Sequence, residues 1–158
     1  MENLFSRHIL SPFLKTIVKF SDRNSFCINE KFYTYNDLVI NISKIRDVLV
    51  TKIINSRQFG LVVNDDIETY ASILALWLEG VAYVPLHPLQ PLERNKEIID
   101  QAGIKLILDS SEQTRFKEFK IIKTSYLKFE KINIQPKLVS DTSLAYILFT
   151  SGSTGKPK

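Results

Sequence analysis

Residues 144–158 read LAYILFTSGSTGKPK, an unbroken apolar run followed by a loop of glycines and hydroxyl side chains. The run from Leu144 to Phe149 has the length and the β-rich composition of a strand buried on both faces of a sheet. Open α/β sheets usually bind ligands at the carboxyl ends of their strands, and this loop directly follows such an end. The stretch therefore predicts a parallel sheet with a ligand-binding loop at its carboxyl edge.

The residue types of this loop suit a phosphate ligand. Glycines allow the backbone to turn several N–H groups toward an anion, hydroxyl groups add donors, and a lysine brings a mobile positive charge. Pro157 disfavours helix at the preceding residue, so the segment should remain a loop. We predict that phosphate is bound by seven consecutive residues: Thr150, Ser151, Gly152, Ser153, Thr154, Gly155 and Lys156.

Two alternatives to this interpretation were weighed. A surface turn of the same composition needs no ligand. The Walker loop is a poor match, because it needs four residues between its first glycine and its Gly-Lys pair, then Ser or Thr. Here only Ser153 and Thr154 separate Gly152 from Gly155, and Pro157 follows the lysine.

The rest of the chain alternates amphipathic helical periodicity with short apolar runs. This alternation predicts an α/β fold, a largely parallel β-sheet covered by helices. Thr34 and the Asn64-Asp65-Asp66 turn are expected to cap helices, and Gly80 and Gly103 to end them. Helices are expected at 8–20, 35–54, 67–80 and 93–102, strands at 59–63, 81–86 and 105–108, and short strands with a connection at 119–137.

Composition places the chain among globular domains. Its 158 residues, 44% hydrophobic and 24% charged, are enough for one domain with a real core. The lone Cys27 excludes an internal disulfide, and its apolar neighbours favour a small buried side chain. No stretch has the length of a membrane span and no signal peptide opens the chain, so a cytoplasmic location is expected.

Neither a nucleic-acid surface nor a protein metal site is predicted. The net charge of +4 arises within residues 105–137, where eight basic residues face four acidic ones without a recognised binding motif. A solvated face is the simpler interpretation. His8 and His87 have no partner at ligand spacing, and His87 is expected to make a structural hydrogen bond in a turn.

Three segments resemble the adenylate-forming ligases, the superfamily of nonribosomal peptide synthetase adenylation domains, acyl- and aryl-CoA ligases and luciferases. Residues 144–158 closely resemble the phosphate-loop signature of that superfamily. Residues 77–88 (WLEGVAYVPLHP) with 91–94 (PLER) are similar to its helix, AYVP strand and P-x-E-R stretch. Residues 32–38 (FYTYNDL) resemble its short first motif, which is weak alone.

The resemblance implies that residues 1–158 are the N-terminal part of an AMP-binding adenylation domain, truncated at the phosphate loop. It implies ATP with Mg²⁺, a carboxylate substrate activated as an acyl-adenylate, and transfer to a thiol of carrier-protein phosphopantetheine or of CoA. His87 stands where amino-acid-activating members commonly have Asp, yet its context is nearer to that branch.

The same resemblance places the substrate pocket, the adenine contacts and the catalytic lysine beyond Lys158, so no catalytic residue is assigned. The isolated chain is expected to be inactive. Two alternatives stay open: a piece of an acyl- or aryl-CoA ligase, and a non-catalytic truncated module.

Overall fold

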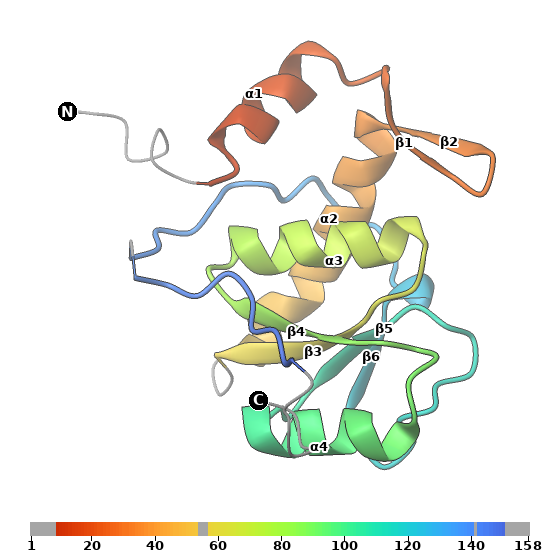
Figure 1. Cartoon of the computed structure of the whole chain (residues 1–158). Helices are drawn as coiled ribbons and strands as arrows, with labels where there is room; N and C mark the ends of the chain where they lie inside the picture. The colour runs from red at the N-terminus through yellow and green to blue at the C-terminus, as the bar shows by residue number, and fades with distance from the viewer. Residues whose placement is uncertain (1–8, 54–56, 141, 151–158) are drawn as a thin grey trace.

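The computed structural model describes residues 9–53, 57–140 and 142–150, and its centre is a four-stranded parallel sheet (Figure 1). The strand order is β4-β3-β5-β6, and each neighbouring pair is parallel. The strands are β3 (Gln58–Val62), β4 (Ala82–Leu86), β5 (Ile107–Asp109) and β6 (Ile121–Lys123). The predicted α/β fold with a parallel sheet is confirmed.

Helices cover both faces of this sheet. Figure 1 shows α2 and α3 on one face and α4 on the other. The larger hydrophobic cluster joins α2 and α3 to the sheet, and a second cluster joins the sheet to Ile98 and Ile99 of α4. The predicted helices are confirmed with these bounds: α2 (Tyr35–Lys52), α3 (Ile67–Leu78) and α4 (Leu92–Ala102).

Side-chain caps set where the helices begin. Thr34 and Asp37 form a reciprocal capping box on α2, with bonds of 3.1 Å from the Asp37 N–H to Thr34 Oγ1 and 2.9 Å from the Thr34 N–H to Asp37 Oδ2. Asp66 caps α3 by accepting the Thr69 N–H at 2.8 Å. Gly103 ends α4 at φ 62°, a left-handed conformation that favours glycine.

An antiparallel hairpin before α2 was not predicted. Its strands are β1 (Asn24–Ile28) and β2 (Lys31–Thr34). Asn29 and Glu30 form the turn between them with φ of 49° and 64°. Both turn residues are left-handed, as in the type I′ turns of tight hairpins, yet neither is a glycine. The sequence therefore lacked the usual turn signal.

Cys27 is exposed, so the prediction of a buried thiol was wrong. Successive residues of a strand face opposite sides. In β1, Ile28 is buried and Phe26 packs against the larger cluster, so the residue between them points outward.

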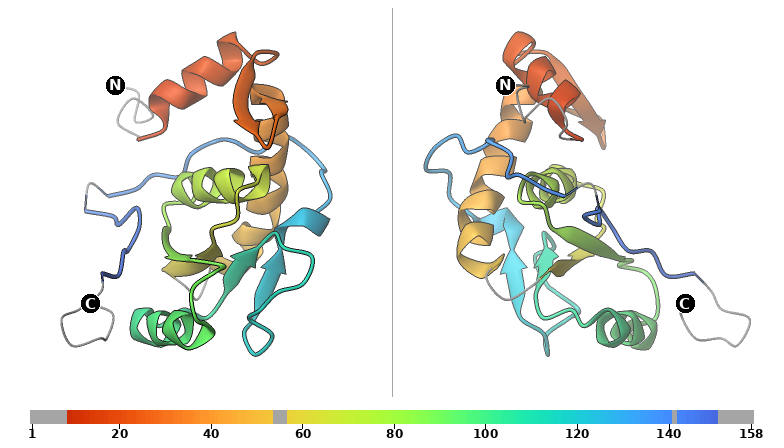
Figure 2. Two further views of the ribbon diagram at one scale, coloured as in Figure 1. Left: turned by 45° about the vertical axis from the view of Figure 1, so that its right-hand side comes forward. Right: turned by 90° about the vertical axis from the view of Figure 1, so that its left-hand side faces the viewer.

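The two remaining predicted segments are shorter than expected. The N-terminal helix, predicted at 8–20, is α1 (Ser11–Lys19), with Pro12 in its first turn. Figure 2 shows α1 and the hairpin at the end of the molecule opposite α4. Within residues 119–137 only β6 is a strand, and a 3-10 turn, η3 (Thr124–Tyr126), follows it.

Beyond η3 the chain continues as an irregular segment, residues 127–140, that we call the strap. It passes across the helical side of the molecule (Figure 2), and its backbone is tied to α2 and to the end of α3. Within the described residues, no helix is long and apolar enough to cross a membrane.

We predict that Gly80→Ala destabilises the fold more than Gly103→Ala. Both glycines are left-handed, which costs an L-residue roughly 1–2 kcal/mol. A Cβ on Gly103 meets nothing within 4 Å, whereas one on Gly80 would lie 2.4 Å from Cγ1 of Val139 in the strap. Urea unfolding of both variants measures the difference, and equal losses would show that the strap does not pack on Gly80.

Candidate functional site

The apolar run that leads to the phosphate-binding residues lies alongside β4, outside the four-stranded sheet. The Tyr83 N–H donates to the Ala145 carbonyl at 3.3 Å, and the Ile147 N–H donates to the Tyr83 carbonyl at 2.9 Å. This pairing is a parallel bridge between Tyr83 and Tyr146. Because the run and β4 point the same way, the described run leads toward the carboxyl edge of the sheet.

The expectation of a strand buried on both faces was wrong for the described residues. Residues 144–149 form one isolated bridge rather than a continuous strand. Their exposure alternates, because one set of side chains packs on the cluster beside α4 and the other set faces outward. Ile147 and Phe149 pack inward, and the outward side chains are Leu144 (64% exposed), Tyr146 (50%) and Leu148 (60%).

The structure places only the first of the seven predicted phosphate-binding residues. Thr150 is exposed at the end of the run. Residues 151–156, which include Lys156, lie outside the described residues, so the predicted phosphate contacts remain a prediction.

The turn after β4 lies at the same edge of the sheet. His87 Nδ1 accepts the Leu89 N–H at 3.1 Å, which confirms its predicted structural hydrogen bond. The fully buried Asn95 of α4 donates through Nδ2 to the His87 carbonyl at 2.9 Å. Arg115 adds bonds to the Pro88 and Gln90 carbonyls, so the turn is held from two sides.

A second polar network at the carboxyl ends of β3 and β5 was missed by sequence reasoning. Asn64 Nδ2 donates to Ser110 Oγ at 2.7 Å, and Ser110 Oγ donates to Asp66 Oδ2 at 2.5 Å. The sequence did contain a signal for this network, since its polar residues follow buried strands: Asn64 and Asp66 follow β3, and Ser110 follows β5. Within the described ranges, no group of three or more His, Cys, Asp or Glu residues is arranged to hold a metal.

The predicted basic face is spread over the surface. Seven of the eight side chains are exposed and Lys123 is half-buried, as expected of solvated lysines and arginines. Three have defined structural partners: Arg115 donates to the Pro88 and Gln90 carbonyls, Lys123 donates to the Ser111 carbonyl, and Lys137 pairs with Glu79. The eight residues are Lys105, Arg115, Lys117, Lys120, Lys123, Lys128, Lys131 and Lys137.

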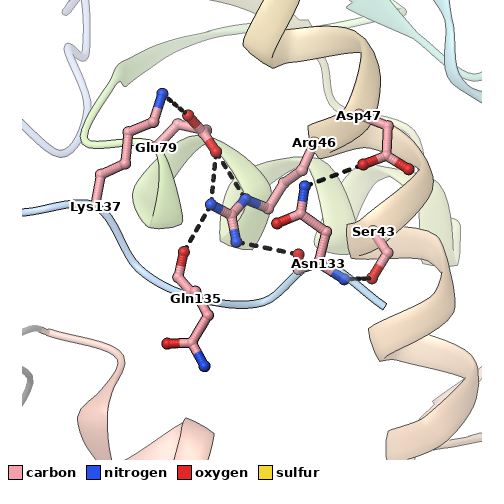
Figure 3. Close-up of polar contacts among 7 residues, drawn as sticks. All are labelled: Ser43, Arg46, Asp47, Glu79, Asn133, Gln135 and Lys137. Atoms are coloured by element: carbon pink, nitrogen blue, oxygen red, sulfur yellow. Dashed lines mark hydrogen bonds and ion pairs between the residues drawn. The ribbon is translucent and has the colours of Figure 1, made fainter. Parts of the chain in front are cut away.

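A buried ion pair fastens the strap (Figure 3). Arg46 of α2 donates to Glu79 Oε1 through Nε at 2.8 Å and through Nη2 at 2.6 Å, and the two side chains are 3% and 0% exposed. The same guanidinium donates to the Asn133 carbonyl at 3.0 Å and to the Gln135 carbonyl at 2.7 Å. Lys137 pairs with the other carboxylate oxygen of Glu79.

Further bonds extend this attachment along α2. The Asn133 N–H donates to Ser43 Oγ at 2.9 Å, and its side-chain amide donates to Asp47 Oδ1 at 3.0 Å. The Lys137 N–H donates to the Leu78 carbonyl at 2.8 Å. The strap is therefore fixed shortly before the apolar run begins.

Aromatic side chains line the junction between the apolar run and the sheet. The Tyr83 ring contacts the rings of Trp77 and Tyr146, with ring centroids 6.3 Å and 6.0 Å away. Burial raises the pKa of the Tyr83 phenol above 10.0, and the neighbouring Tyr146 raises it further. Trp77 packs against the larger cluster and also donates its indole N–H to the Ala145 carbonyl at 2.9 Å.

Comparison with known proteins identifies the family. The family model described as "AMP-binding enzyme" matches residues 13–158. The chain belongs to the AMP-binding enzyme family. It is 31% identical over 132 residues to nonribosomal peptide synthetase 7 of Aspergillus fumigatus, covering 79% of this chain and 6% of that protein. It is 30% identical over 131 residues to surfactin synthase subunit 2 of Bacillus subtilis, covering 79% and 4%.

Solved structures share the fold of this AMP-binding chain. Holo-PA1221, an NRPS protein with adenylation and PCP domains bound to a vinylsulfonamide inhibitor, matches with a TM-score of 0.82 and 23% identity. That match covers 99% of this chain and 28% of the other. The N-terminal subdomain of Klebsiella oxytoca NpsA with 3-hydroxyanthranilyl-AMSN matches with a TM-score of 0.79 and 23% identity, covering 96% and 39%.

We predict that Glu79→Ala costs about 3–5 kcal/mol of unfolding free energy, because it leaves the buried Arg46 guanidinium without its counter-charge. Urea denaturation measures the loss. The matched control is the double variant Arg46→Met/Glu79→Leu, which removes both charges and should recover part of it. Recovery stays partial because the Asn133 and Gln135 carbonyls lose their donor. A loss from Glu79→Ala below about 1 kcal/mol, the usual value of an exposed pair, would contradict the burial argument.

We also predict that stability falls as the pH rises above 10. The pKa values of Tyr83 and of Tyr70, whose hydroxyl donates to Asp65, are raised, so the folded chain holds phenol protons that the unfolded chain has released. Tyr83→Phe should make the fall shallower. Tyr146→Phe should lower the Tyr83 pKa without removing its shift, because burial is the larger cause. Phenolate absorbance measures the Tyr83 pKa, and unfolding curves at several pH values give the dependence of stability on pH. An unchanged pH dependence in Tyr83→Phe would contradict the role of Tyr83.

Proposed function

We propose that residues 1–158 form the N-terminal part of an adenylation domain that activates a carboxylate as an acyl-adenylate at the expense of ATP. The observation that carries this proposal is the path of the apolar run, which follows β4 toward the carboxyl edge of the parallel sheet. That edge is where α/β sheets bind ligands, and the phosphate-type loop sequence comes next. An amino acid is the proposed substrate class, because the relatives compared above are peptide synthetases.

The loop would act on the leaving group of the reaction. In the proposed step the substrate carboxylate attacks the α-phosphate of ATP, forming the acyl-adenylate and releasing pyrophosphate. The hydroxyl and N–H groups of residues 150–155 and the Lys156 ammonium would hold the β- and γ-phosphates and offset their charge. This is a task of positioning and electrostatic stabilisation rather than covalent chemistry.

Mg²⁺ is proposed to accompany the nucleotide. It is usually held by substrate phosphates with only one or two carboxylates, and rarely by an all-protein cage. A carrier-protein thiol is the proposed acceptor, since the matched PA1221 structure pairs its adenylation domain with a PCP domain. A cytoplasmic location is also proposed, because a reaction that consumes ATP fits that compartment.

The test is Lys156→Ala in a protein that carries this chain together with the rest of an adenylation domain. One charge-assisted hydrogen bond contributes roughly 1.5–3 kcal/mol, so kcat/KM for adenylation should fall about 10- to 150-fold. Pyrophosphate exchange dependent on an amino acid measures the change.

The control is Lys158→Ala, which removes an equal charge two residues away and outside the proposed phosphate-binding set. It should change the rate little. Thiol transfer from preformed adenylate should also be nearly unaffected in Lys156→Ala. Equal losses in the two variants, or equal losses in adenylation and transfer, would contradict the assignment of Lys156.

A further inference from the structure

The apolar run before the phosphate loop has few backbone bonds to set its register. Its pairing with β4 is a single bridge, in which Ala145 accepts from Tyr83 and Ile147 donates back. Sheet register is strongly specified where one face is buried over several residues, and weakly specified in short pairings. A slip of one residue would turn Ile147 and Phe149 outward and move the start of the loop along the sheet edge.

Trp77 supplies a bond that such a slip would break. Its indole Nε1 donates to the Ala145 carbonyl at 2.9 Å, across 68 residues of sequence. That carbonyl also accepts the Tyr83 N–H at 3.3 Å, so both of its acceptor positions are used. A half-buried indole N–H needs a partner, and here the Ala145 carbonyl supplies it.

The aromatic contacts favour the same register of the run on β4. The Tyr83 ring contacts the rings of Trp77 and Tyr146, with centroid distances of 6.3 Å and 6.0 Å. If the run slipped by one residue, Ala145 or Ile147 would replace Tyr146 beside Tyr83. The hydrogen bond and the ring contacts therefore select one alignment between α3, β4 and the run.

We propose that Trp77 is a positioning residue for the phosphate-binding loop: by holding the Ala145 carbonyl it sets the register of the run and thereby where Thr150 and the following residues begin. Thr150 lies five positions after Ala145. At about 3.3 Å per extended residue, a slip of one residue shifts the loop by about the length of a hydrogen bond. The expected effect on ATP binding rests on the proposed function, whereas the contact between Trp77 and Ala145 does not depend on it.

The test compares Trp77→Phe with Tyr70→Phe. The first keeps an aromatic ring and removes the N–H donor, whereas the second removes a hydroxyl donor from the same helix, bonded to Asp65 at 3.0 Å and away from the run. In Trp77→Phe, amide exchange at Ile147 should accelerate roughly 2- to 12-fold, the range for one neutral hydrogen bond. Exchange at Val63, whose N–H bonds the Leu86 carbonyl across β3 and β4, should stay constant.

A kinetic measurement tests the link to the loop. In a protein that carries the complete adenylation domain, Trp77→Phe should raise the KM for ATP by a similar factor, with the KM for the carboxylate unchanged, and Tyr70→Phe should change neither. Trp77 is the only tryptophan among these 158 residues, so loss of its emission confirms the substitution.

Three outcomes overturn the proposal: unchanged exchange at Ile147, equal acceleration at Ile147 and Val63, or equal increases in both KM values. If the unsubstituted protein shows no ATP-dependent exchange of pyrophosphate, the proposed function fails instead. The Ile147 measurement then still decides whether Trp77 holds the run.

Discussion

The buried pair between Arg46 and Glu79 is the interaction on which the arrangement of the chain beyond η3 depends. It joins the middle of α2 to the end of α3, and the same guanidinium binds two carbonyls of the strap. Ion pairs buried this deeply are seldom strongly stabilising compared with apolar residues of equal size, but breaking one is costly. Its contribution here is therefore mainly specificity, because only one path of the strap satisfies all the donors.

The end of α3 makes three different attachments to the part of the chain that leads to the candidate site. Glu79 binds Lys137, Gly80 gives room to Val139, and Trp77 binds Ala145. All three contacts come from residues 77–80, so one end of the helix holds both the strap and the apolar run that follows it. Residues that resemble a family motif in the sequence thus act in the structure as a scaffold.

The sequence predicted the elements whose signals are local. Helix α2 has a capping box and regular apolar spacing, and Gly103 ends α4 as glycine commonly does. The hairpin was missed because Asn29 and Glu30 adopt left-handed conformations without a glycine. The burial of Cys27 was misjudged because apolar neighbours in sequence do not reveal which face of a strand a residue occupies. The run at 144–149 was misjudged for a related reason, since an unbroken apolar run carries no alternation that could show an open face.

For the predicted phosphate-binding residues, the sequence indicates the ligand, whereas it does not indicate where the residues are placed. Their types indicate the ligand class, because glycine, hydroxyl and ammonium groups are what a phosphate needs. The run that leads to them is held by groups without such chemistry, namely the carbonyl of Ala145 and the N–H of Ile147. No pattern in the sequence connects Trp77 with Ala145, since they are 68 positions apart and the bond uses a backbone acceptor that every residue has. A short motif can therefore disclose what is bound, whereas the contacts that place it emerge only when the chain is folded.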